Sequence, residues 1–244
     1  MKTTFKVILT VLVVAFYSCK SNIENESSSS SITSDGLFSG KIVNYDSSLI
    51  DSIKVYDSSY SSSILGKSSI TNDGKFSMTL LIPKLRKIGT EIGIMKSLTV
   101  SDSTALIGNI IIRTFKRGVW KADLQRCNIN MDSVQTAGTS YTYFIYVDRA
   151  ITIKGTENYS YSSEEYSKNL TFICNLKNKK GWNEWVAKID SDATTKTCYT
   201  FKMSITNTIT SDLQWILIPM PYYNGAKQKV KRQKGLNSLD LFCE

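Results

Sequence analysis

The sequence predicts an all-β protein on three observations. It has only three prolines but thirteen tyrosines, together with many threonines and other β-branched residues, and this composition favours strands. Short segments alternate apolar and polar residues with a period of two, most clearly at residues 141–147 and 199–205. No long stretch repeats apolar residues with the 3.6-residue period of a helix. With 41% hydrophobic residues, the chain can also bury a sizeable core.

Residues 1–18 have the pattern of an export signal. Lys2 and Lys6 precede an apolar run at residues 7–16, and the chain becomes polar directly after Cys19. The run is too short to span a bilayer, which takes roughly 20 apolar residues. We therefore expect residues 1–18 to be a signal peptide that is removed after export.

The segment Phe16-Tyr17-Ser18-Cys19 resembles the lipobox of bacterial lipoproteins, which ends in a small residue followed by the acylated cysteine. The resemblance implies that Cys19 is the lipid attachment site and that the chain's first partner is a lipid membrane. Several acyl chains on one residue give stable anchoring without a transmembrane helix. An ordinary secretory signal with a chance cysteine, or a short buried helix, is the alternative interpretation.

Residues 19–36 are mostly short polar side chains, including five consecutive serines at 27–31. This composition predicts a flexible linker behind the lipid anchor. We expect order to begin near Leu37, with strands at residues 37–43 and 50–56. Asn72-Asp73-Gly74 lies between two strand-like runs and predicts a hairpin, after which the alternation continues as far as Pro83.

The matching segments Gly40-Lys41-Ile42-Val43, Ile53-Lys54-Val55-Tyr56 and Asn72-Asp73-Gly74-Lys75-Phe76, with Gly66 between them, give residues 37–82 a family resemblance. They resemble the regulatory-like domain named after the carboxypeptidases, a small immunoglobulin-like sandwich. The resemblance implies a non-catalytic scaffold or adaptor domain, which we place at residues 37–92.

Residues 93–218 predict a second β-sandwich domain, because strand-like runs recur there at sandwich spacing. Lys179-Lys180-Gly181-Trp182 is expected to be a hairpin turn. The strands are expected at residues 97–100, 107–115, 141–147, 151–154, 169–176, 182–189, 197–205 and 213–218.

Parts of this second domain resemble uncharacterised lipoproteins common in Bacteroidota, at residues 146–156, 175–183 and Leu213-Gln214-Trp215. The resemblance implies an outer-membrane lipoprotein of the cell envelope, periplasmic or surface-exposed. The predicted fold is then a lipoprotein signal and linker followed by two immunoglobulin-like β-sandwich domains and a tail at residues 219–244.

The net charge of +9 is unevenly distributed. Lysines 2 and 6 lie in the signal, and a basic cluster at residues 227–234 lies in the tail. The rest of the chain is only mildly basic and shows no nucleic-acid-binding signature, so we expect a solvated tail and no nucleic-acid partner.

Histidine is absent from the sequence. Histidine is the commonest general base and a frequent metal ligand, so its absence lowers the expectation of catalysis. We predict no enzyme, no catalytic residues, no metal and no cofactor. Glu164-Glu165 is interpreted as part of a solvated loop, since neighbouring residues on a strand point to opposite faces.

Aromatic residues offer the best candidate ligand surface. Trp182 and Trp215 lie in or beside apolar runs and are expected in the core. Tyr159, Tyr161 and Tyr166 have Ser, Glu and Lys neighbours and are the candidates for exposure and ligand binding. We expect a scaffold, adaptor or binding module whose partner is an envelope protein or a glycan. The alternatives are a glycan-binding lipoprotein of a nutrient-uptake system and a histidine-free hydrolase.

The cysteine spacings match no CxxC redox or zinc pattern. Cys174 shares its strand face with apolar residues, whereas Cys198 alternates with Thr200 and Lys202. One thiol should therefore face the core and the other the solvent, so we predict that the two do not form a disulfide.

Overall fold

Strands account for nearly all of the regular structure, as the alternating residues predict. The computed structural model describes residues 30–91, 97–128, 136–162, 167–193, 195 and 198–219. Within these residues the one helix is a single turn, α1 (Ile88–Glu91). The expected all-β class is confirmed. The strands are β1 (Leu37–Lys41), β2 (Ser52–Asp57), β3 (Tyr60–Ser69), β4 (Lys75–Thr79), β5 (Arg86–Lys87), β6 (Leu98–Val100), β7 (Leu106–Lys116), β8 (Val119–Cys127), β9 (Ser140–Val147), β10 (Ile151–Ser162), β11 (Ser167–Asn178), β12 (Gly181–Asp192), β13 (Cys198–Thr206) and β14 (Gln214–Pro219).

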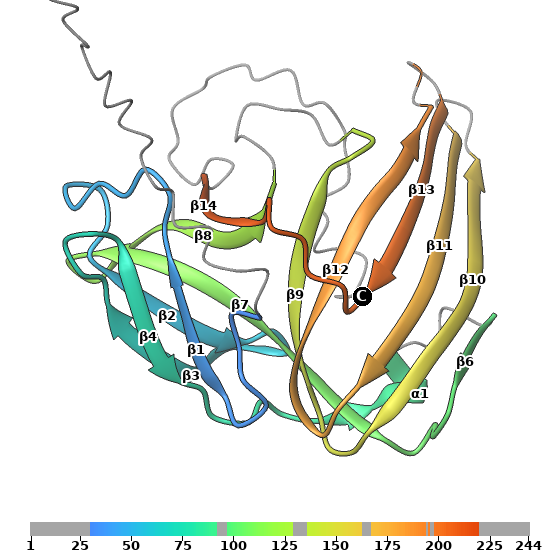
Figure 1. Ribbon diagram of the computed structural model, residues 1–244, viewed down its shortest axis with the longest axis horizontal. Helices are drawn as coiled ribbons and strands as arrows, with labels where there is room; N and C mark the ends of the chain where they lie inside the picture. Colours follow the sequence, from blue (N-terminus) through green and yellow to red (C-terminus); the bar gives the residue numbers. More distant parts are fainter. Residues whose placement is uncertain are drawn as a thin grey trace, which may run out of the picture.

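All strands except β1 and β4 join in one curved sheet (Figure 1). Its order is β3-β2-β7-β8-β9-β12-β13-β11-β10-β6, with β14 beside β8 and β5 beside β7. β1 and β4 form a separate antiparallel pair. We call β1–β4, β8 and β14 the small lobe, and β6 and β9–β13 the large lobe. They lie on the left and right of Figure 1, and β7 pairs with strands of both.

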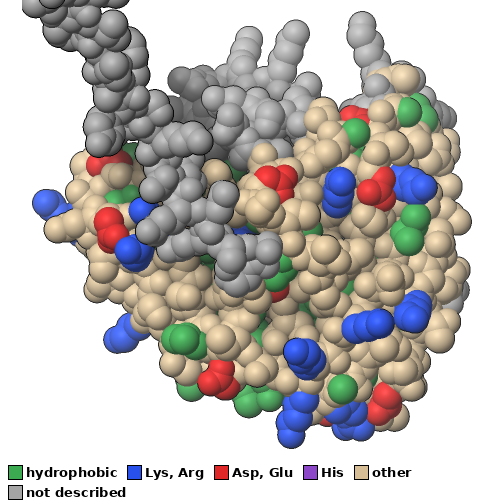
Figure 2. Space-filling model, in the orientation of Figure 1, with side chains coloured by type: hydrophobic (Ala, Val, Ile, Leu, Met, Phe, Trp, Pro, Cys, Tyr) green, Lys and Arg blue, Asp and Glu red, His purple; other side chains and the backbone are tan. Residues whose placement is uncertain are grey.

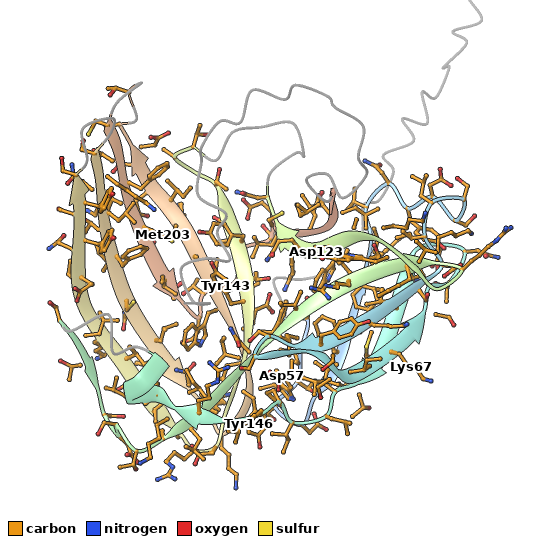
Figure 3. The ribbon with its side chains drawn as sticks, turned by 180° about the vertical axis from the view of Figure 1, so that it is seen from behind. Asp57, Lys67, Asp123, Tyr143, Tyr146 and Met203 are labelled. Carbon is orange, nitrogen blue, oxygen red and sulfur yellow. The ribbon has the colours of Figure 1, made fainter. Side chains whose placement is uncertain are left out.

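Each lobe encloses its own hydrophobic core. The small-lobe core contains Phe38, Phe144, Trp182 and Trp215. The large-lobe core contains Trp185, with Tyr143 packed against it and Met203 within it, and Figure 3 shows the last two inside the large lobe. β9 and β12 contribute to both cores, because alternate residues of a strand point to opposite faces of the sheet.

The expected division between residues 92 and 93 does not coincide with a boundary between these cores. β2 (Ser52–Asp57) pairs along its whole length with β7, on the other side of that boundary. The small-lobe core also includes Phe144, Trp182 and Trp215 from the second expected domain. The strands of residues 37–92 therefore bury their apolar faces only with the help of strands from later in the chain.

The start of order differs from the expected boundary at Leu37. Ile32 is buried in the small-lobe core, and Trp182 donates its backbone N–H to the Ser34 carbonyl at 3.1 Å. Residues 30–36, expected to belong to the linker, are thus part of the fold, because Ile32 supplies an apolar side chain that the small-lobe core takes up. Residues 1–29, with the expected signal and Cys19, lie outside the described residues.

The turn at Asn72-Asp73-Gly74 is present as predicted. The Thr71 N–H donates to the Lys75 carbonyl at 2.9 Å, and Gly74 has a φ of +84°, which favours glycine. The two strands that it joins do not pair with each other, however. β3 pairs with β2, and β4 pairs with β1, so the turn connects two different sheets rather than closing a hairpin.

The turn after β11 shows the same departure from the predicted hairpin. β11 and β12 are joined through Lys179 and Lys180, but β13 lies between them, parallel to β11 and antiparallel to β12. Asn207, directly after β13, connects β11 and β12 through its side-chain amide. Its Oδ1 accepts from the Lys177 N–H at 2.6 Å, and its Nδ2 donates to the Glu184 carbonyl at 3.3 Å.

β8 forms a strand that the sequence pattern did not predict. β3 is the strand-like run expected before the Asn72-Asp73-Gly74 turn; it is rich in serine and lies at the end of the sheet order. β14 extends one residue into the expected tail, with Pro219 opposite Ala122. Residues 220–244 of that tail lie outside the described residues.

Candidate ligand-binding surface

Two of the three candidate tyrosines lie together near the end of β10. Tyr159 and Tyr161 are two residues apart on an unbroken strand register, so both point to the same face of the sheet. This is the face on which Ile151 and Ile153 enter the large-lobe core. Each tyrosine is 45% exposed, as their polar neighbours predicted. Tyr166, like Glu164-Glu165, lies outside the described residues.

The tyrosines extend the inner face of the large lobe beyond its core. Tyr159 is directly opposite Leu170 of β11, which is buried, and Leu170 in turn pairs with the half-buried Phe201 of β13. Two residues along a strand span roughly 6.6 Å, so the two rings lie side by side. Their arrangement suits stacking against a ligand's apolar face, and each hydroxyl can form a hydrogen bond at its edge.

A second candidate surface lies on the outer side of the small lobe. Ile53 and Val55 of β2 enter the core, so Lys54 and Tyr56 point outwards. Lys54 Nζ lies 4.4 Å from the centre of the Phe115 ring, and that ring lies 6.4 Å from the ring of Tyr56. Tyr56 and Phe115 are both buried but belong to neither core.

Arg113 continues this row of cations and rings onto β8. Its guanidinium carbon lies 5.2 Å from the Tyr56 ring centre and 4.2 Å from that of Trp120. Such contacts stabilise cations over aromatic faces. We call Lys54, Phe115, Tyr56, Arg113 and Trp120 the cation–aromatic ladder. It connects β2, β7 and β8 across the outer face of the sheet.

Asp123 lies beside the ladder, on the side of the molecule seen in Figure 3. Burial raises the pKa of Asp123, and Arg113, whose Nε lies 3.8 Å from the carboxylate, partly offsets the rise. Three buried polar atoms here have no hydrogen-bond partner in the structure: Arg113 Nε, Trp120 Nε1 and Asp123 Oδ1. The cation–aromatic ladder therefore combines ring faces with buried polar groups, and Arg113 and Trp120 both lower the pKa of the neighbouring Asp123 against the effect of its burial.

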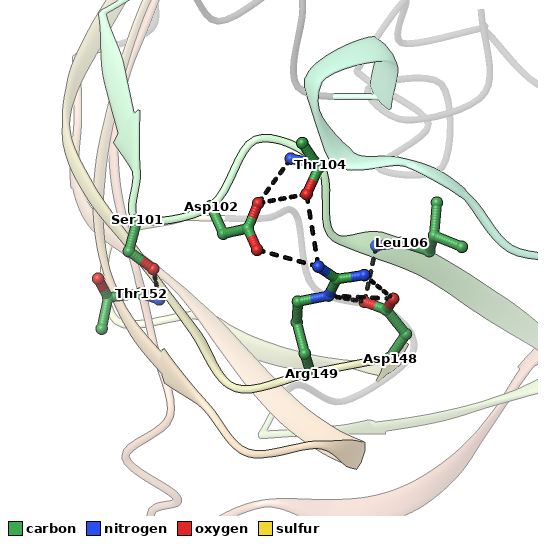
Figure 4. A network of polar contacts seen from close by, with 7 residues as sticks. All are labelled: Ser101, Asp102, Thr104, Leu106, Asp148, Arg149 and Thr152. Carbon is green, nitrogen blue, oxygen red and sulfur yellow. Dashed lines mark hydrogen bonds and ion pairs between the residues drawn. The ribbon is translucent and has the colours of Figure 1, made fainter.

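Arg149 makes a network that closes one end of the large lobe (Figure 4). Its guanidinium donates to Asp148 at 2.8 Å and to Asp102 at 3.2 Å, and so joins two loops. Asp148 also accepts the Leu106 N–H at 2.8 Å. The Thr104 hydroxyl holds the pKa of Asp102 below its usual value, and Arg149 does the same for Asp148. This network fixes loop positions rather than presenting an open site.

Arg126 and Glu184 form a buried ion pair at 2.8 Å between β8 and β12. Glu184 also accepts from the Ser30 hydroxyl at 3.0 Å and from the Ser31 N–H at 2.9 Å. The pair thus fastens the first described residues of the chain to the centre of the sheet. Sequence patterns gave no sign of it, since its members come from segments far apart in the chain.

On the face shown in Figure 2, lysines and arginines are interspersed with acidic side chains, and most of the surface is neither charged nor hydrophobic. Within the described residues, no group of three or more Cys, Asp or Glu is placed to hold a metal ion. The two surfaces with ligand-binding character are therefore the tyrosine pair and the cation–aromatic ladder.

Cys174 and Cys198 are free thiols. The prediction that Cys174 and Cys198 remain unpaired is confirmed. Cys174 belongs to the large-lobe core. Cys198 lies at the other end of the paired segments of β11 and β13, opposite Ser167. Burial raises the pKa of Cys174 to about 11, and hydrogen bonds from Ser167 and Thr200 lower the pKa of Cys198.

Cys198 should therefore react with a thiol reagent in the native protein at a lower pH than an ordinary cysteine, because the thiolate is the nucleophile. Cys174 should react only after unfolding. Alkylation of native protein at pH 7, followed by peptide mass spectrometry, measures both. Rapid native labelling of Cys174 would contradict its burial, and a Cys174–Cys198 cross-linked peptide would contradict the register of β11 and β13.

No family model matches the chain, and neither a curated protein nor a solved structure is significantly similar to it. The resemblances to the carboxypeptidase regulatory-like domain and to Bacteroidota lipoproteins therefore remain predictions from the sequence.

Proposed function

We propose that the protein is a non-catalytic lipoprotein of the bacterial cell envelope, anchored through Cys19 in the outer membrane, that acts as a scaffold, adaptor or binding module. The observation that carries this proposal is the N-terminal sequence, in which an apolar run of signal-peptide length ends directly before Cys19. The absence of histidine from the whole sequence supports a non-catalytic role.

The start of the fold supports the same proposal. The described structure starts at residue 30, and ten residues separate it from the proposed anchor. The polar composition of residues 20–29 predicts a flexible linker of roughly 16–19 Å, which would hold the protein close to the membrane surface. Ser30 and Ser31 bond to the buried Glu184, so a pull on the anchor would be transmitted to the centre of the sheet.

No helix among the described residues is long and apolar enough to cross a bilayer. Replacing Cys19 with serine should release the protein from the membrane fraction, because the acyl chains lose their attachment site. The measurement is carbonate washing of envelopes from cells that express the full chain, with blotting of pellet and supernatant. A Ser18→Ala variant keeps a small residue before Cys19 and should remain in the pellet. Cys19→Ser protein that resists the wash would show that the assignment is wrong.

A glycan-binding lipoprotein of a nutrient-uptake system is the second candidate. The specific observation in its favour is the exposed pair Tyr159 and Tyr161, which lie on one face of β10.

A further inference from the structure

Three loops lie together at one end of the small lobe. They connect β1 to β2, β3 to β4 and β7 to β8. The Ile42 N–H donates to the Gly74 carbonyl at 3.0 Å, and the Arg117 N–H donates to Asp51 Oδ2 at 2.8 Å. Figure 1 shows the loops at the left end of the molecule. We call them, with the strand residues beside them, the small-lobe tip, which consists of residues 41–51, 70–75 and 116–121.

The small-lobe tip exposes aliphatic side chains. Leu49 and Val119 are 57% and 58% exposed, and Val43 is 37% exposed. The first two lie on adjacent loops, because Lys116, which pairs with Val119, donates through Nζ to the Ser47 carbonyl. Apolar side chains that project from a protein surface bind the interface of a bilayer more strongly as they bury more area there.

The small-lobe tip also carries cations that no carboxylate neutralises. Lys75 lies 3.1 Å from Asp73. Lys116 lies 3.9 Å from Asp51. The other basic residues of the tip are exposed and form no ion pair with a described residue: Lys41, Arg117 and Lys121. Asp46 is the remaining acidic residue, so the tip has five basic and three acidic side chains and a net charge of +2.

The first described residues direct the chain towards the small-lobe tip. Ile32 bridges Phe38 of β1 in the antiparallel sense. Followed backwards to residue 30, the chain therefore runs in the same direction as β1, which ends at the tip. Residues 20–29, which span at most roughly 33–36 Å when extended, connect this point to the proposed anchor at Cys19. This geometry directs the tip, rather than the opposite end of the small lobe, to the membrane.

We infer that the small-lobe tip docks on the surface of an anionic phospholipid bilayer. Leu49 and Val119 enter the interface, and the three cations without an ion pair lie beside the lipid phosphates, which attract them. This inference rests on the proposed anchor at Cys19 and names the surface that the anchored protein turns to the membrane. The large lobe, at the opposite end of the molecule in Figure 1, then faces away from the bilayer and is available to a partner.

Leu49 and Ile82 provide matched positions for a probe. Both side chains are aliphatic and 57% exposed. Ile82 lies at the opposite end of the small lobe, where the Leu80 N–H donates to the Gly36 carbonyl at 2.9 Å, directly before β1. A dye on Leu49→Cys should therefore contact lipid, and the same dye on Ile82→Cys should stay in water.

Each variant is made in the full chain with Cys198 and Cys243 replaced by serine, purified from detergent-extracted cells and labelled with a nitrobenzoxadiazole dye. It is then reconstituted with vesicles of phosphatidylcholine and phosphatidylglycerol that contain a nitroxide-labelled lipid as quencher. Most of the emission should be quenched at position 49, and little at position 82. Protease resistance equal to that of the parent confirms the fold of each variant.

Flotation of the vesicles tests the anchor separately. Protein that does not float with the vesicles is not anchored, and both the proposed function and the docking of the tip are then wrong. Protein that floats but is quenched equally at the two positions, or more strongly at position 82, overturns the docking of the tip alone.

Arg117→Gln, made in the Leu49→Cys chain, tests the role of charge. Loss of one cation beside an anionic surface should lower the ratio of docked to undocked protein about five-fold and so reduce the quenching. Lys87→Gln is the matched control, because Lys87 is exposed but lies on β5, outside the tip. It should leave the quenching unchanged. Equal quenching of the two variants in the anionic vesicles would overturn the assignment of an anionic surface.

Discussion

Replacing Arg126 with alanine should lower the free energy of unfolding by about 3–5 kcal/mol. The side chains of Arg126 and Glu184 are only 8% and 1% exposed, and they contact each other at 2.8 Å. Without Arg126, the Glu184 carboxylate stays in the core, where Ser30 and Ser31 are its remaining side-chain hydrogen-bond partners among the described residues. A buried charge without its counter-ion is costly because water cannot solvate it. Urea unfolding followed by tryptophan fluorescence measures the change.

Arg149→Ala is the matched control for this prediction. Arg149 also lies 2.8 Å from a carboxylate, Asp148, and it makes a further ion pair with Asp102. It is however 49% exposed, and water replaces the lost contacts, so the expected loss is much smaller than for Arg126→Ala. Equal losses for the two variants would show that burial does not control the strength of the Arg126–Glu184 pair.

The two predicted hairpin turns show how far local sequence determines this fold. Both Asn72-Asp73-Gly74 and Lys179-Lys180-Gly181 lie in tight turns, because the conformation of a few residues is set by neighbours in the chain. The pairing partners of their flanking strands depend on residues far away in the chain. β13 is inserted beside β11 by a ladder that begins at Ser167 and Cys198, and no local pattern encodes that choice.

The sequence could not predict where the small-lobe core ends and the large-lobe core begins, for a related reason. The strand at residues 50–56 was expected, and in β2 alternate residues, Ile53 and Val55, enter the small-lobe core. Alternation does not show which other strand covers them. The covering residues, Phe144 and Trp215, come from segments that looked like a separate domain.

The same distinction between local and long-range features applies to the candidate surfaces. Exposure of Tyr159 and Tyr161 was predictable, since it depends on the polar residues beside them in the chain. The cation–aromatic ladder was not, because Tyr56, Arg113 and Trp120 come from three strands that meet only in the folded sheet. Sites built within one strand can be found from sequence alone, whereas sites built across strands require the pairing order.

Trp215→Ala should destabilise the protein by about 3–5 kcal/mol. The Trp215 ring is buried where three other rings meet, 5.4 Å from Phe38, 5.4 Å from Phe76 and 5.5 Å from Phe144. These rings belong to β1, β4 and β9, so Trp215 on β14 holds the separate β1–β4 pair to the main sheet. Gly40 lies so close that a Cβ there would come within 2.5 Å of Trp215 Cδ1, which shows how tightly the ring is packed.

Tyr159→Ala is the control for this last prediction, because it also removes an aromatic ring but one that is half exposed and outside both cores. Its effect on the free energy of unfolding of the monomer should stay within about 0.5 kcal/mol. Trp215→Phe should fall between the two, since a smaller ring keeps some of the contacts with Phe38 and Phe144. Urea unfolding followed by far-ultraviolet circular dichroism measures all three variants. If Trp215→Ala costs no more than Tyr159→Ala, the β1–β4 pair is held to the sheet by contacts other than this aromatic cluster.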